Sequence, residues 1–94
     1  MNKALRRYMA STIAEEVKTE IDRSEELYGP FHSLHEGLAV LREEYKELEE
    51  EIFWGHQKSG NADGVRAEAI HVAAMAIRIA MQITPVPLDL PHQN

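Results

Sequence analysis

The order of apolar and polar positions along the chain predicts three helices and no strand. Apolar residues recur every three or four positions over residues 2–27, 33–54 and 64–83, and β-branched residues nowhere alternate with polar ones. Gly29-Pro30 is a typical helix stop, because glycine adopts the conformation that closes a helix and proline cannot continue it. We therefore expect an all-α chain in which residues 1–83 form a single helical domain.

A capping box opens the second predicted helix. The hydroxyl of Ser33 can accept a hydrogen bond from the Glu36 amide, and the Glu36 carboxylate can reach back to the Ser33 amide. Asp63 is expected to cap the third helix. The second helix then carries apolar residues at alternating spacings of four and three, which predict one packing seam formed by Leu34, Leu38, Leu41, Tyr45, Leu48 and Ile52.

The third predicted helix is apolar on almost every side. Its apolar residues include Val65, Ala67, Ala69, Ile70, Val72, Ala73, Ala74, Ala76, Ile77, Ile79 and Ala80. Two neighbouring helices cannot cover so much apolar surface, so we expect a second copy of the chain to cover the rest. The predicted assembly is a homo-oligomeric helical bundle, a dimer or a tetramer, built around paired third helices. The proline-rich tail, residues 84–94, is expected to be extended.

Charge and composition narrow the classes of function. The 94 residues carry a net charge of −6, and residues 36–51 hold seven acidic residues against only Arg42 and Lys46. A field of that sign repels phosphate backbones, so nucleic acid is not an expected partner. No stretch is apolar for long enough to span a bilayer or to act as a signal peptide, so we expect a cytoplasmic protein with no membrane partner. The absence of cysteine excludes disulfides, thiolate metal sites and a cysteine nucleophile.

The second predicted helix gathers carboxylates beside its apolar seam. At about 100° per residue, Glu44, Glu47 and Glu51 fall within about 60° of one another. Carboxylates so close raise one another's pKa, and a bound Mg²⁺ or Mn²⁺ relieves the repulsion by taking oxygen ligands from several of them. The alternative is an ordinary solvated flank with Arg42 and Lys46 nearby.

The third predicted helix adds an acid and a histidine on one side. Its polar residues Glu68, His71, Arg78 and Gln82, with Met75 among them, fall within a sector roughly 80° wide. Glu68 and His71 are spaced i, i+3, and bundles that hold metals in their cores use such pairs on facing helices. The alternative is that Glu68, His71 and Arg78 form a solvent stripe, with Glu68 favoured by the positive end of the helix.

The segment "EEYKEL", followed after a linker by "RAEAIHVAAMAIRIA", resembles the MazG-like all-α nucleoside triphosphate pyrophosphohydrolase superfamily. The signature of that superfamily is ExxE on one helix and ExxD on the next, and Glu44-xx-Glu47 and Glu68-xx-His71 occupy these places. The phrase "GPFHSLHEGLAVLREEYKELEEEI" is similar to small, often phage-associated members. The resemblance covers residues 29–83, and the first helix fits it only generally.

The resemblance implies an oligomeric bundle in which four acidic residues hold Mg²⁺, and hydrolysis of a nucleoside triphosphate to a nucleoside monophosphate and pyrophosphate. It places Glu44 and Glu47 as catalytic residues, with Glu44, Glu47, Glu68 and His71 around the metal. His71 departs from the pattern, which has aspartate there. Imidazole favours Mn²⁺, Zn²⁺ or Fe²⁺ over Mg²⁺, so His71 either ligates a softer ion, donates to substrate, or marks a weakened site.

Other residues leave alternatives open. Arg78 is a candidate substrate contact that could bind a phosphate or the carboxylate cluster, or could be a surface arginine. Trp54 is a second candidate, which could stack on a base of the substrate or lie at an interface. Glu16 and Glu20 could add a carboxylate pair from the first helix, although exposure to solvent is the expectation for both. The rival functions are a catalytically inactive relative that acts as an interaction module through the seam, and a metal or nucleotide sensor that binds without turnover.

Overall fold

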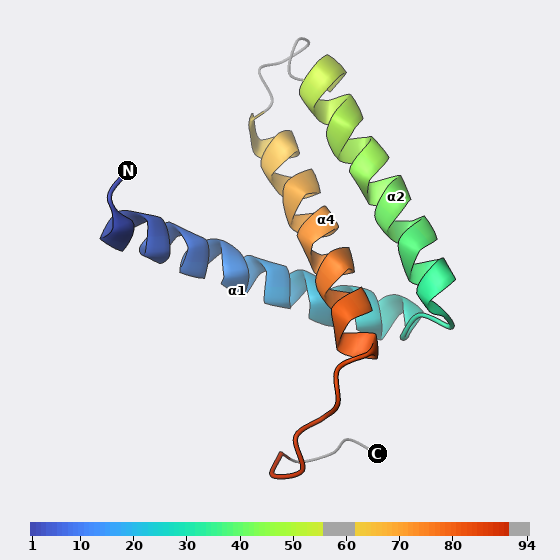
Figure 1. Ribbon diagram of the computed structural model, residues 1–94. Helices are drawn as coiled ribbons and strands as arrows, with labels where there is room; N and C mark the ends of the chain where they lie inside the picture. The colour runs from blue at the N-terminus through green and yellow to red at the C-terminus, as the bar shows by residue number, and fades with distance from the viewer. Residues whose placement is uncertain (56–61, 91–94) are drawn as a thin grey trace.

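The computed structural model describes residues 1–55 and 62–90, and these residues form helices and no strand (Figure 1). In chain order the elements are α1 (Lys3–Tyr28), α2 (Leu34–Glu50), the short π-helix η1 (Glu51–Gly55) and α4 (Ala62–Gln82). The all-α prediction is confirmed, and the predicted ranges agree with the helix ends to within a few residues. Most of the predicted linker, with His56, and the end of the tail, with His92, lie outside the described residues.

The helix ends follow the predicted chemistry with two corrections. Gly29 has a φ of 74° and its N–H donates to the Glu25 carbonyl at 2.8 Å, which closes α1. The Ser33 hydroxyl accepts from the Glu36 amide at 3.0 Å as expected, but the Glu36 carboxylate bonds the His32 amide at 3.2 Å and not the Ser33 amide. The His32 ring, whose Nδ1 lies 2.9 Å from the same carboxylate, gives Glu36 a second partner there. Asp63 lies inside the first turn of α4 and is not its cap.

Helix α4 is the element that joins the other two. It lies antiparallel beside α2 and crosses α1, while the N-terminal half of α1 extends beyond both neighbours (Figure 1). The described apolar core is small and consists of Val17, Ile21, Phe31, Ala74 and Met75. The resulting molecule is flat, with extents of 47 × 35 × 18 Å.

The side of α2 that packs on α4 is not the predicted seam. Gly37 is buried, and Val40, Leu41, Glu44 and Leu48 are half-buried against the rest of the chain. Of the six seam residues, Leu34, Leu38, Tyr45 and Ile52 stay exposed. The packed face is therefore rotated toward the acidic flank of α2, and Glu44 of that flank is half-buried while Glu47 stays exposed.

Gly37 sets how closely α2 approaches its neighbours. A Cβ atom at this position would lie 2.9 Å from Ile79 Cγ1 and 3.0 Å from Phe31 Cδ2. We expect Gly37→Val to lower the free energy of unfolding by about 1–3 kcal/mol through overpacking, measured by urea denaturation. Ala39→Val, which places the same side chain at an exposed position of the same helix, is the control and should cost at most about 0.7 kcal/mol. Because valine is a better helix former than glycine, a Gly37→Val protein as stable as the wild type would show that packing does not govern the site.

After Gln82 the chain leaves the bundle. Residues 83–90 are non-helical, and Leu88 in this segment is 95% exposed. The segment runs away from the three helices in Figure 1. Within the described part of the chain, no helix has both the length and the apolar character to cross a membrane.

Candidate functional site

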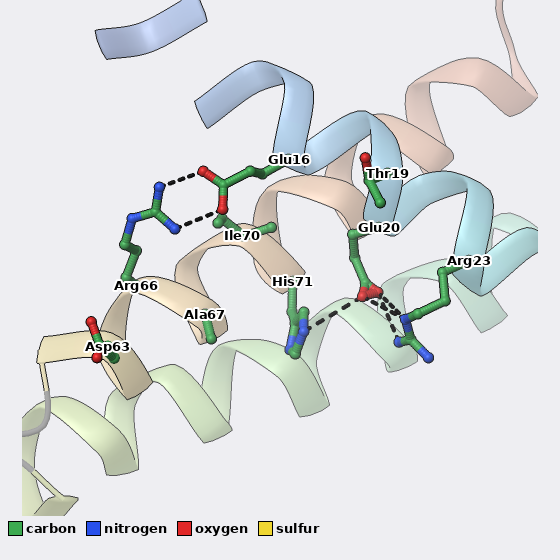
Figure 2. A pocket seen from close by; sticks show the side chains of 9 residues that line it. All are labelled: Glu16, Thr19, Glu20, Arg23, Asp63, Arg66, Ala67, Ile70 and His71. Carbon is green, nitrogen blue, oxygen red and sulfur yellow. Dashed lines mark hydrogen bonds and ion pairs between the residues drawn. The ribbon is translucent and has the colours of Figure 1, made fainter. Parts of the chain in front are cut away.

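His71 lies where the three helices meet and faces a carboxylate from each of them. Its Nδ1 is 3.3 Å from Oε2 of Glu68 on its own helix and 3.6 Å from Oε2 of Glu44 on α2. Its Nε2 is 3.5 Å from Oε1 of Glu20 on α1, the contact drawn in Figure 2. A single imidazole ring is thus the point at which charges from α1, α2 and α4 converge.

Glu44, Glu68 and His71 have the geometry of a cation site. Each offers one ligand atom, these atoms lie within 4.8 Å of one another, and all three residues are half-buried. Oε2 of Glu44 is buried and accepts no hydrogen bond in the described structure. A buried carboxylate oxygen without a donor is unfavourable, and a cation would satisfy it. The fold therefore brings together three of the four residues that the sequence predicts around a metal.

Glu47, the fourth predicted ligand, is exposed and lies outside this triad. It nevertheless acts on Glu44. Burial raises the pKa of Glu44 above its ordinary value, and the charge and a hydrogen bond of Glu47 raise this pKa further, while His71 opposes the shift. Glu47 is thus a neighbour of the cluster at its solvent edge.

Glu20 is a residue that sequence reasoning misplaced. Its predicted exposure is wrong, because its side chain is only 9% exposed and both oxygens accept hydrogen bonds from Arg23 Nε at 2.8 Å. The hydrogen bond from Arg23 lowers the pKa of Glu20, which keeps the carboxylate ionised beside His71. The available sequence signal was the interruption that Glu16 and Glu20 make, one turn apart, at the edge of the apolar face of α1.

The position of Glu20 orients the histidine. Without a cation, carboxylates flank both ring nitrogens, Glu20 at Nε2 and Glu68 at Nδ1. A cation bound at Nδ1 would leave the ring proton on Nε2, where the Glu20 carboxylate can accept it. Histidine ligands of metals commonly donate their other ring N–H to a carboxylate in this way. The arrangement accordingly suits His71 Nδ1 as one nitrogen ligand next to two carboxylate oxygens.

A cleft of about 450 Å³ between α1 and α4 opens beside His71 (Figure 2). The pair of Glu16 and Arg66 lies on one side of it and the pair of Glu20 and Arg23 on the other. Each arginine is held by a single carboxylate. The cleft is within the size range of small-molecule sites, and its guanidinium groups are donors suited to phosphate oxygens.

The structure separates the two predicted substrate contacts from that cleft. Arg78 is 4% exposed and its Nε and Nη2 donate to Glu25 Oε2 at 2.9 and 2.6 Å, so the solvent-stripe interpretation is wrong for this residue. Its Nη2 also donates to the Gly29 carbonyl at 2.8 Å, and its guanidinium stacks 4.1 Å from the centre of the Phe31 ring. Trp54 is 63% exposed in η1. Arg78 also lines a small cavity of about 110 Å³ together with Glu44 and His71.

Comparison of the chain with protein-family models, with curated proteins and with solved structures found no match. The resemblance to the MazG-like superfamily therefore stays a prediction.

The raised pKa of Glu44 predicts a stability effect with a defined sign. A group whose folded pKa is raised binds its proton more tightly in the folded state, so ionised Glu44 destabilises the metal-free protein at neutral pH. Without metal, Glu44→Gln should raise stability at pH 7 by up to about 1 kcal/mol, or roughly 4–8 °C in Tm.

The advantage of Glu44→Gln should shrink as the pH falls through the raised pKa of Glu44. Glu16, Glu20 and Glu36, whose pKa values are lowered by Arg66, Arg23 and His32, lose stabilising contacts in acid in both proteins. The difference in Tm between wild type and variant, scanned from pH 7 to acid, therefore reports Glu44. A difference that grows toward acid would contradict the assignment.

Proposed function

We propose that the protein is a divalent-metal-dependent nucleotide pyrophosphohydrolase that converts a nucleoside triphosphate to a nucleoside monophosphate and pyrophosphate. The observation that supports it is the convergence of Glu44, Glu68 and His71 from two facing helices on one half-buried point. These residues belong to the two motifs on which the family resemblance rests. The substrate class comes from that resemblance, and the cluster gives it a chemical basis.

The residues of the site have distinct roles in this proposal. Glu44, Glu68 and His71 would hold Mg²⁺ or Mn²⁺, and a bound divalent ion supplies neutralisation of the triphosphate charge and a water of lowered pKa. Glu47, which is exposed and hydrogen-bonded to Glu44, would orient the attacking water at the edge of the site. Arg23 and Arg66 would guide phosphate oxygens into the cleft next to His71.

The proposal includes the metal and the assembly. His71 brings a nitrogen and no negative charge, so it favours Mn²⁺, whereas Mg²⁺ prefers oxygen. His71→Asp should therefore tighten Mg²⁺ binding in a calorimetric titration, and an unchanged or weaker affinity would argue against His71 as a ligand.

Self-association into a homo-oligomeric bundle is the second part of the proposal, and dimers and tetramers are both compatible with it.

The direct experiment incubates the purified protein with a panel of nucleoside triphosphates and Mg²⁺ or Mn²⁺ and measures pyrophosphate. We expect metal-dependent release of pyrophosphate together with the matching monophosphate, faster with Mn²⁺ than with Mg²⁺. Release of orthophosphate and a nucleoside diphosphate would refute the proposed bond cleavage. If no triphosphate gives any phosphate product, the proposal that the protein is an enzyme is refuted.

One observation favours a rival function. Leu38 and Tyr45 of α2 and Ile52 of η1 form an apolar edge that is exposed in the described part of the chain. An inactive relative could use this edge as an interaction module. A metal sensor would instead show a metal-induced rise in Tm with no turnover, which the same samples can reveal.

A further inference from the structure

A carboxylate of α1 lies between the guanidinium group of Arg23 and the ring of His71. Oε1 of Glu20 accepts a hydrogen bond from Arg23 Nε at 2.8 Å and lies 3.5 Å from His71 Nε2. Oε2 of the same residue is 2.7 Å from Arg23 Nη2. Figure 2 shows the Glu20 carboxylate between the two side chains. A permanent positive charge therefore stands beside the imidazole that is proposed to bind a metal ion.

Arg23 also stands where two cavities meet. Glu20, Arg23 and His71 line both the cleft of about 450 Å³ between α1 and α4 and the cavity of about 110 Å³ that Glu44 lines as well. The hydrogen bond and the charge of Glu20 raise the pKa of Arg23, and the charge of Glu44 adds a smaller contribution. The guanidinium is thus close enough to act on the carboxylates of the proposed metal site, and it borders the space in which phosphates would lie.

The exposure of Arg23 allows its guanidinium to change partner. The side chain of Arg23 is 54% exposed, whereas that of Glu20 is only 9% exposed. Guanidinium forms bidentate pairs with phosphate as well as with carboxylate. If Arg23 turns to a phosphate in the cleft, Glu20 keeps His71 as a neighbour. The contact between Arg23 and Glu20 is therefore one that a phosphate can replace.

We propose that Arg23 is a specificity-determining residue that favours the complex of a metal ion with a phosphate over the free ion. Without a phosphate, its positive charge repels a bare divalent cation at the site. When a phosphate accompanies the metal, the same charge attracts the phosphate oxygens, and the repulsion is replaced by a favourable contact. This inference rests on the proposed function, to which it adds the form in which the ligand is recognised.

The test compares Arg23→Gln with the wild type in two calorimetric titrations, one with Mn²⁺ alone and one with Mn²⁺ bound to a nucleoside triphosphate analogue. In the analogue a methylene group replaces the oxygen between the α and β phosphorus atoms, so that bond is not hydrolysed. We expect the variant to bind free Mn²⁺ about three- to tenfold more tightly, because a nearby positive charge is removed. It should bind the complex at least about tenfold more weakly, because a phosphate contact is lost.

Opposite signs in the two titrations distinguish this role from a structural one. If Arg23 only held Glu20 in place, its replacement would weaken binding in both titrations or in neither, and either result would overturn the inference. Arg23→Lys keeps the charge, so it should bind free Mn²⁺ within about twofold of the wild type. A gain in Mn²⁺ affinity as large as that of Arg23→Gln would also overturn it. Circular dichroism checks that each variant keeps its helices.

Arg66→Gln is the matched control from the other side of the cleft. Arg66 also pairs with a glutamate of α1, and its pKa is raised by the hydrogen bond and charge of Glu16 and by the charge of Asp63, both outside the metal triad. We expect this variant to bind the complex more weakly and free Mn²⁺ within about twofold of the wild type. An equal gain in Mn²⁺ affinity for both variants would show that net charge alone sets the affinity, and would overturn the role of Arg23.

Pyrophosphate release separates this inference from the proposed function. A wild type that releases pyrophosphate, beside an Arg23→Gln protein whose Mn²⁺ affinity is unchanged, would reject the role of Arg23 and retain the enzyme. A wild type that binds no Mn²⁺ in either titration would overturn both.

Discussion

Glu44→Gln is expected to weaken Mn²⁺ binding by roughly a hundredfold or more, and pyrophosphate release with it. The amide keeps the shape of the side chain but removes one of the two negative charges of the triad. Even replacing a residue that only hydrogen-bonds a metal ligand lowers the metal affinity about 10–100-fold. Isothermal titration with Mn²⁺ measures the affinity, and Tm with added Mn²⁺ gives an independent readout. The wild type should gain Tm on adding the ion, and the variant should not.

Glu49→Gln is the control for this prediction. Glu49 is an exposed glutamate of α2, so its replacement removes the same charge from the same helix outside the triad. We expect its Mn²⁺ affinity to stay within about twofold of the wild type, because exposed charges are screened by salt. Comparable losses in both variants would mean that the general acidity of α2, and no defined site, attracts the ion.

Arg78→Met is expected to lower the free energy of unfolding by about 2–3 kcal/mol, because hydrogen bonds of a buried charged group are lost while Glu25, which is 34% exposed, can be solvated. The change removes both hydrogen bonds to Glu25, leaves the Gly29 carbonyl without this donor and ends the stacking on Phe31. Methionine retains most of the apolar stem, so the loss reports the guanidinium and not a cavity. Urea denaturation followed by circular dichroism measures it.

Arg66→Met provides the matched comparison. Arg66 also makes a bidentate ion pair with a glutamate of α1, Glu16, but both side chains are more than 40% exposed. We expect a loss below about 1 kcal/mol, since exposed ion pairs contribute little. Equal losses for Arg66 and Arg78 would contradict the view that burial makes the Arg78 network important.

The sequence was sufficient to predict the helices and much of the side-chain cluster around His71. Gly29 and Ser33 fix their helix ends through local chemistry, which depends on a few neighbouring residues only. Glu44, Glu68 and His71 could be placed together because each lies at the edge of an apolar stripe, and facing helices bring such edges into contact.

The sequence could not place Glu20 or Arg78. Helical periodicity gives the side of a helix on which a residue lies, but the angle at which α1 crosses α4 decides which edge becomes buried. Charged residues are rarely buried unless paired, and the partners of Arg78 lie 49 to 53 residues away along the chain. The predicted seam of α2 is the opposite case, because its apolar residues were expected to be buried and most of them are exposed. A regular apolar pattern does not reveal whether the surface that packs against it belongs to the same chain.

The overhang of α1 has a consequence for local opening of the native state. Residues 1–12 are exposed throughout, and the N-terminal half of this helix extends past α4 and α2 (Figure 1). An uncovered helical stretch shorter than about 12–15 residues is marginal in water, so its amides should exchange with deuterium far sooner than those near Val17 and Ile21. Slow exchange along the overhang in solution would mean that another surface shields it.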